Sequence, residues 1–125
     1  MIVGIGVDIV EIRRLRQALA RQGERFMHRV YTPEEQDFCR RRQDPAPFLA
    51  VRFAAKEALF KAIGTGWARG VTWLDVEVRR TEGEAPRLVL RGKAREISDR
   101  LGARSLHVSL SHSSDYAVAV VILEN

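Results

Sequence analysis

The hydrophobic pattern divides the chain into helices early and strands late. Residues 2–10 alternate branched apolar side chains with Gly and Asp, and this period of two predicts a strand. Residues 11–30 place apolar side chains at helical spacing, with Gly23 as a candidate break in the helix. A capping box with proline at the first helical position begins a second helix at residues 32–35, which we expect to end near residue 42.

A third helix, predicted for residues 48–63, is apolar nearly all round and ends at Gly64. The next segments, residues 73–80 and 87–91, have strand character and flank a polar turn, which predicts a hairpin. These patterns indicate that a long buried helix is followed by antiparallel strands.

Residues 93–101 predict a short helix closed by Gly102. Two final strands, residues 106–112 and 116–123, are joined by short polar side chains that suit a tight turn. The pattern as a whole predicts an α+β fold, in which an antiparallel sheet packs against the long apolar helix of one compact domain spanning residues 1–125.

Composition supports a folded, globular chain. Its 125 residues fit one domain, 46% are apolar and 30% are charged. Cys39 is the only cysteine, which predicts a reducing compartment, and no apolar run has the features of a signal peptide or the length of a membrane span. We therefore expect a cytoplasmic protein with no membrane partner.

The net charge of +5 predicts an anionic partner, which could be nucleic acid, a phosphorylated small molecule or an acidic protein. Arg14, Arg21, Arg25 and Arg29 are spaced by seven, four and four residues, so they lie along one stripe if the helix persists past Gly23. Such a stripe is either an ordinary solvated face or a docking surface for an acidic helix.

Asp8 is the first candidate for chemistry. Gly4 and Gly6 share its strand face, so the sequence predicts open space in which a ligand could approach the backbone. The alternative is that Asp8 caps the helix that follows.

Glu57 and Lys61 lie four residues apart within the long apolar helix, where a charge is costly unless it is paired. They either form a structural ion pair or face a ligand. In the second case Asp8 and Glu57 would hold Mg²⁺ together with phosphate oxygens, and Lys61 would face the same phosphates. In the late strand, His107 alternates with serines on one face, which a half-exposed strand explains as well as a phosphate contact does.

Three blocks of sequence, in this order, resemble the bacterial holo-acyl-carrier-protein synthases, which are small phosphopantetheinyl transferases. They are Gly4-Ile5-Gly6-Val7-Asp8-Ile9, then Arg52-Phe53-Ala54-Ala55-Lys56-Glu57-Ala58 with Lys61 and Gly64-Thr65-Gly66, and finally His107-Val108-Ser109. The resemblance runs nearly end to end. It implies transfer of phosphopantetheine from coenzyme A to a serine of acyl carrier protein, with release of 3′,5′-ADP, in fatty acid biosynthesis.

The resemblance also implies roles for particular residues. Asp8 and Glu57 would bind Mg²⁺ and, with Lys61, serve catalysis. Gly64 and His107 would join these three in the coenzyme A site. The four arginines of the stripe would face the carrier protein, and the protein would be a homotrimer with active sites between subunits. The proton of the serine would go to Glu57 or to a carboxylate of the carrier protein.

Two other functions fit the composition less well. A non-catalytic nucleic-acid-binding module could use the arginines, but most of the nine aromatic residues fall on apolar faces, where they would not stack on bases. A magnesium-dependent hydrolase of another nucleotide would share the carboxylates but not the carrier-protein surface. We therefore expect no nucleic acid partner.

Overall fold

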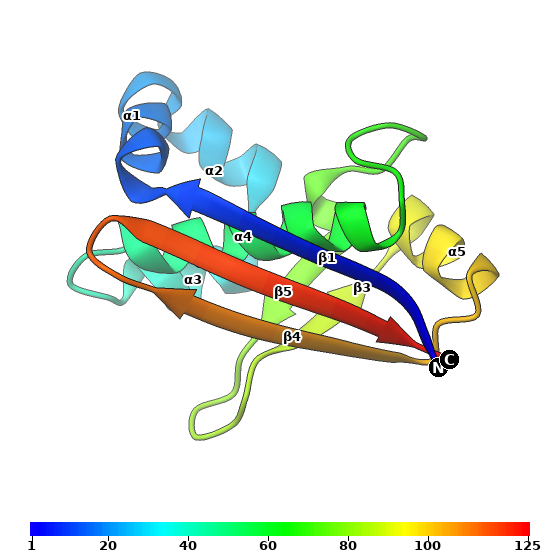
Figure 1. The fold of residues 1–125 in the computed structure, drawn as a ribbon. Coiled ribbons are helices and arrows are strands. Elements are labelled where there is room, and N and C mark those ends of the chain that lie inside the picture. The colour runs from blue at the N-terminus through cyan, green and yellow to red at the C-terminus, as the bar shows by residue number, and fades with distance from the viewer.

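A three-stranded antiparallel sheet forms one side of the molecule. The computed structural model describes all 125 residues, and its sheet has the strand order β1 (Ile2–Glu11), β5 (Tyr116–Glu124), β4 (Ser105–His112). Both chain termini lie at the same end of this sheet (Figure 1). The predicted α+β fold with an antiparallel sheet is confirmed.

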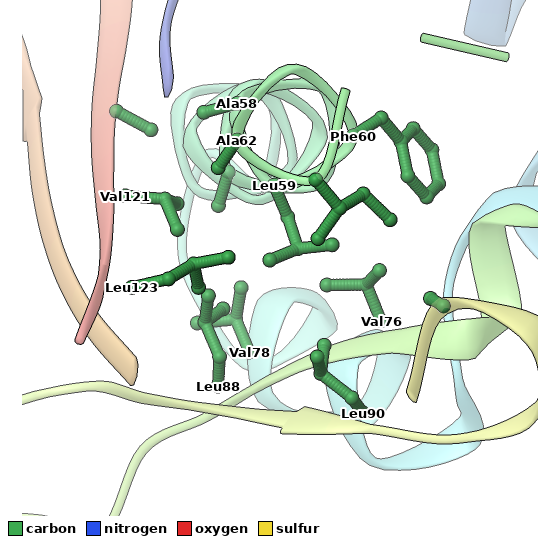
Figure 2. Close-up of a cluster of buried hydrophobic side chains, with 14 of the residues drawn as sticks. Ala58, Leu59, Phe60, Ala62, Val76, Val78, Leu88, Leu90, Val121 and Leu123 are labelled. Atoms are coloured by element: carbon green, nitrogen blue, oxygen red, sulfur yellow. The ribbon is translucent and has the colours of Figure 1, made fainter. Parts of the chain in front are cut away.

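Helix α4 (Ala46–Ala62) crosses the inner face of the sheet, and a small hairpin of β2 (Val76–Arg79) and β3 (Arg87–Leu90) completes the core. Figure 2 shows buried side chains from α4, β5 and the hairpin meeting between these three layers. The packing confirms the prediction that the long apolar helix lies against the sheet. No helix is long and apolar enough to cross a membrane.

The first helical region is broken, as Gly23 suggested. Helix α1 (Ile12–Gln22) ends at Gly23, whose φ of 57° and ψ of −130° stop the helix, and α2 (Glu24–Val30) starts in a new direction. The four arginines therefore do not form one continuous helical stripe. That arrangement depended on an unbroken helix, and the break at Gly23 rules it out.

The other helices follow the predicted pattern with one exception. Helices α3 (Pro33–Arg40) and α5 (Gly92–Arg100) form where capping and apolar spacing indicated them. Residues Trp73–Asp75 form a 3₁₀ turn, η1, rather than the start of a strand. Asp75 accepts hydrogen bonds from the backbone N–H and hydroxyl of Thr72, and this local cap tightens the backbone before β2 begins.

Gly4 and Gly6 let the sheet and α4 approach unusually closely. A Cβ atom on Gly6 would lie 1.9 Å from the carbonyl oxygen of Ala58, and one on Gly4 would lie 2.3 Å from that of Ala62. The space beside these glycines is therefore filled by the α4 backbone. The prediction that a ligand would enter there is wrong, because the helix occupies the space.

A buried ion pair holds α4 to the rest of the chain. The ammonium of Lys56 lies 2.8 Å from the carboxylate of Glu35, and neither side chain is exposed. Lys56 also donates to the carbonyls of Val30 and Trp73, while Glu35 accepts from the backbone of Val78. With its partners this well satisfied, the pair ties α2, α3, η1 and β2 around one point of α4.

We expect Gly6→Ala to lower the free energy of unfolding by about 3 kcal/mol, because the added methyl group meets a backbone carbonyl that cannot rotate away. Urea denaturation measures the change. Ser105→Ala, at an exposed position of β4, is the matched control and should alter stability little. A Gly6→Ala protein as stable as the control would show that α4 can shift away from β1.

Candidate active site

Asp8 and Lys61 meet where β1 crosses the carboxyl-terminal half of α4. The ammonium of Lys61 lies 2.8 Å from Oδ1 of Asp8 and 3.0 Å from the carbonyl oxygen of Val7. Lys61 thus pairs across the β1–α4 contact, not with Glu57 on its own helix. Asp8 does not cap α1 either, since the cap position is Glu11 and no side chain bonds the helix start.

Glu57 lies beside this pair, and the pKa of its carboxyl group is raised. Burial, and after it the negative charge of Asp8, raise the pKa of Glu57, Lys61 opposes both effects, and the net result is a pKa of about 7. The influence of Asp8 means that the two carboxylates are close enough to repel. The two acidic residues predicted from separate sequence blocks are thus brought together.

This site suits a cation that takes some of its ligands from the substrate. No group of three or more His, Cys, Asp or Glu side chains could hold a metal ion by itself. Asp8 and Glu57 supply two carboxylates, and Mg²⁺ is usually held by one or two carboxylates with phosphate and water oxygens. A divalent cation would also offset the repulsion that raises the pKa of Glu57.

The loop after α4 offers few free donors to a phosphate. The N–H of Gly64 donates to the carbonyl of Lys61, while those of Thr65 and Gly66 both donate to Phe60. Gly64, with a φ of 79°, therefore acts as the predicted helix stop. A contact between Gly64 and coenzyme A stays a prediction, and it would have to use something other than this N–H.

His107 lies on the outer face of the sheet, away from α4. Its Nε2 is 2.6 Å from a carboxylate oxygen of Glu124 on the neighbouring strand. Asp8 lies on the inner face of the sheet, so one chain does not bring His107 to the carboxylates. The role of His107 in binding coenzyme A stays a prediction. For His107 to share a site with the carboxylates, a second copy of the chain would have to supply it.

The predicted docking arginines are all exposed but lie on two helices. Arg14 and Arg21 lie seven residues apart on α1, and Arg25 and Arg29 lie on α2. Arg29 donates to Gln22, and its guanidinium lies 6.0 Å from the ring centre of Phe26. The surface is therefore a basic corner around the helix break.

A mostly apolar cavity of about 390 Å³ separates this basic corner from Glu57. We call it the α1 cavity. Leu15, Ala18 and Phe26 line it, with Arg14 and Glu57 at its polar edges. A partner bound to α1 could therefore reach Glu57 through an apolar path.

A second cavity contains residues to which the sequence motifs assigned no role. This arginine pocket, of about 710 Å³, is lined by Arg41, Arg42, Arg52 and Arg80 together with His112. Arg52 is 2% exposed, and its Nε has no hydrogen-bond partner. The sequence contained one signal for this pocket, which is the position of Arg52 within an apolar helix. The other residues that line the pocket come from the end of α3, the hairpin and β4, which only the fold brings together.

An α+β fold that brings Asp8, Glu57 and Lys61 together is compatible with a site for a phosphorylated substrate. A family model described as the 4'-phosphopantetheinyl transferase superfamily matches residues 4–121. Because this match covers nearly the whole chain, the chain belongs to the 4'-phosphopantetheinyl transferase superfamily, as the sequence motifs predicted.

Named relatives agree with this family. The holo-[acyl-carrier-protein] synthase of Koribacter versatilis (strain Ellin345) is 50% identical over the full length of both chains. The structure of the corresponding synthase from Neisseria meningitidis superposes with a TM-score of 0.89 at 33% identity, covering 100% of each chain. The synthase from Bacillus anthracis str. Ames, solved in complex with CoA (3',5'-ADP), gives a TM-score of 0.81 at 38% identity, covering 98% of this chain and 96% of that one.

The raised pKa of Glu57 predicts a specific pH dependence. Between the ordinary value of 4.5 and about 7, the folded protein keeps a proton that the unfolded chain has released. The free energy of unfolding should therefore fall as pH rises through this range. Asp8→Asn removes the nearby negative charge, so it should lower the pKa of Glu57 and flatten this fall.

Carbon-detected NMR titration of the Glu57 carboxyl and urea denaturation at several pH values measure both effects. Asp99→Asn, which removes an exposed carboxylate paired with Arg95, is the control and should leave the titration of Glu57 unchanged. An identical Glu57 midpoint in Asp8→Asn and the unaltered protein would contradict the assigned proximity.

Proposed function

We propose that this protein transfers the 4′-phosphopantetheine group of coenzyme A to a serine of apo acyl carrier protein and releases 3′,5′-ADP. The observation that carries this function is the Asp8–Glu57–Lys61 cluster, in a chain whose named relatives are holo-[acyl-carrier-protein] synthases. Relatives solved with coenzyme A support the choice of donor. The cytoplasm remains the predicted site of this reaction.

Asp8 and Glu57 would hold Mg²⁺ on the pyrophosphate of the donor. When bound, the ion would neutralise charge that develops on the phosphate oxygens. Lys61 is 52% exposed in its side chain, so its ammonium can turn from Asp8 toward a phosphate. In this proposal the chain would supply two negative ligands for the ion and one positive charge for the phosphate.

Glu57 is our candidate for the base that takes the proton of the carrier serine, directly or through a water. Without a metal its pKa is about 7, and a bound cation would lower this pKa and keep the carboxylate deprotonated, which is the form that accepts a proton. The serine oxygen then bonds to phosphorus, and the bond from phosphorus to the bridging oxygen of 3′,5′-ADP breaks.

The arginine pocket is suited to the remaining phosphates of the donor, because it gathers four guanidinium groups in one hollow. Arg52 and Glu57 are five positions apart on α4 and so lie about 140° apart around the helix. A donor held at both places would therefore span two copies of the chain.

We propose the homotrimer as the assembly that provides the second copy. The outer face of the sheet exposes Ile5, Val7 and Ile9, which are 62%, 56% and 64% accessible, beside half-buried Val118 and Val120. A continuous exposed apolar face is typical of a protein interface. Light scattering should give a mass three times the 14.2 kDa of one chain, and a monomeric mass would contradict the assembly.

Carrier protein would dock at the basic corner of α1 and α2. An acidic helix fits Arg14, Arg21 and Arg25 by charge, and an apolar side chain on that helix fits the α1 cavity. This cavity ends at Glu57, so docking there brings the serine toward the reacting phosphorus.

Incubation with coenzyme A, Mg²⁺ and apo carrier protein, followed by mass spectrometry of the carrier, tests the function. The carrier should gain the mass of phosphopantetheine. Glu57→Gln should fold normally but lose at least about 100-fold in turnover, because an amide is neither a base nor a good Mg²⁺ ligand. Unmodified carrier with the unaltered enzyme would refute the proposed reaction, and near-normal turnover of Glu57→Gln would remove Glu57 from the mechanism.

For Arg14→Glu we expect the association rate with carrier protein to fall about tenfold, while the affinity for coenzyme A changes little. Stopped-flow binding and calorimetry measure the two quantities. Arg100→Glu makes the same charge change on α5, far from the basic corner along the chain, and serves as control. Equal slowing by both variants would indicate a general charge effect and not a docking surface.

A further inference from the structure

A further cavity, of about 480 Å³, lies where the loop after α4 meets α5. We call it the α5 cavity. Three of its six lining residues are basic, three are aliphatic and none is acidic: Ile63, Arg69, Lys93, Ile97, Arg100 and Leu101. It shares no residue with the arginine pocket or the α1 cavity. The proposed transfer and carrier docking therefore do not use it.

One face of α5 forms much of this cavity. Lys93, Ile97 and Arg100 are four and three residues apart, so they lie on one stripe of the helix. The ion pair of Arg95 with Asp99 lies on the opposite side, about 160° around the helix from Ile97. The helix thus turns an ion-paired face to solvent and a face with cations and aliphatic side chains toward the cavity.

The three cations of the cavity have one carboxylate between them. Glu96, which does not line the cavity, pairs with Lys93 at 3.4 Å and also with Arg100. Arg69 pairs with no carboxylate, and its φ of 64° is left-handed. Glycine adopts this conformation freely, as Gly70 does next to it, whereas a side chain makes it costly. The turn by itself would favour glycine at position 69, so the guanidinium is the better reason for an arginine there.

The aliphatic part of the cavity suits a hydrocarbon chain. Ile63 and Ile97 are buried, and Leu101 is 40% exposed. An apolar group that covers Leu101 removes hydrocarbon surface from water, which favours binding. The cations suit a doubly charged phosphate, because guanidinium groups bind phosphate oxygens through paired hydrogen bonds. The lining as a whole therefore fits a molecule that has a phosphate at one end and a hydrocarbon chain at the other.

We propose that the α5 cavity binds the phosphate monoester of an amphiphile, with the phosphate among the three cations and the hydrocarbon chain over the three aliphatic side chains. Free alkyl phosphates and the headgroup of phosphatidic acid both present this chemistry. No covalent bond forms or breaks. The inference goes beyond the proposed transfer, since it uses none of the residues assigned to the donor, the metal or the carrier protein.

Octyl phosphate is the probe, and titration calorimetry of the unaltered protein measures its binding. Inorganic phosphate and octanol each carry one half of this probe. Each should bind at least about tenfold more weakly, because it leaves either the aliphatic side chains or the cations without a partner. Methyl NMR should show octyl phosphate shifting the signals of Ile63, Ile97 and Leu101, which locates the ligand in the α5 cavity.

Arg69→Gly separates binding from folding. It should lower the affinity for octyl phosphate about tenfold, because a charge-assisted contact to phosphate is lost. The same change should keep or raise the free energy of unfolding, since glycine adopts the left-handed conformation without strain. Urea denaturation measures the second effect, so a loss of affinity cannot be attributed to a damaged fold.

Two further variants test the two halves of the site. Arg95→Gln removes one positive charge from the opposite face of α5, so it is the matched control and should leave octyl phosphate binding unchanged. Leu101→Ala should weaken octyl phosphate binding about threefold by removing apolar contact, and it should not change the binding of inorganic phosphate.

Flotation with phosphatidylcholine vesicles, with and without phosphatidic acid, distinguishes the two sources of the ligand. Flotation that requires phosphatidic acid, and that Arg69→Gly reduces but Arg95→Gln does not, would place the phosphate on a bilayer. Octyl phosphate binding without flotation would assign the cavity to a free molecule. Both results support the α5 cavity as the site.

Other outcomes would overturn the inference. One is that octyl phosphate does not bind. Another is that Arg69→Gly and Arg95→Gln weaken its binding equally, because the attraction would then come from the general positive charge of the chain. A failure to modify carrier protein would count against the proposed function alone, because these binding measurements need neither coenzyme A nor carrier protein.

Discussion

The close contact between strand β1 and helix α4 is the constraint on which the site depends. Two glycines on the inner face of β1 leave room only for a helix backbone, whose carbonyl oxygens would lie within 2.3 Å of any added Cβ. At this separation Asp8 of the strand reaches Lys61 of the helix at 2.8 Å and raises the pKa of Glu57. A wider gap between the two elements would leave three separate surface charges.

The buried Lys56–Glu35 pair fixes how α4 is rotated within this contact. Lys56 precedes Glu57 directly, and its ammonium binds oxygens from α2, α3 and the start of η1. Burial lowers the pKa of Lys56, while the charge of Glu35 favours its protonated form. Because a turned helix would leave these charges unpaired inside the protein, the pair keeps Glu57 directed toward Asp8.

Two of the cavities follow from the same helix. One side of α4 faces the arginine pocket through Arg52, and another side faces the α1 cavity through Phe53 and Glu57. Guanidinium groups gather in the first cavity, whereas mostly apolar side chains line the second. One buried helix thus separates the regions that we propose for the nucleotide phosphates and for the carrier protein, with Glu57 at the edge of the second.

The sequence by itself determined where the helices and most strands lie along the chain, and it identified Asp8 and Glu57 as the two candidate carboxylates. Periodicity and capping are local, so the α+β fold, the long helix and the stop at Gly64 could be predicted from neighbouring residues, and the motifs around Asp8 and Glu57 indicated the family. Only the tertiary structure decided that Lys61 pairs with Asp8, that the helix backbone fills the space beside Gly6, and that Arg52 joins an arginine pocket. Each of these contacts joins residues distant in sequence, and their distances depend on how closely the elements pack and at what angle they cross, which local patterns do not encode.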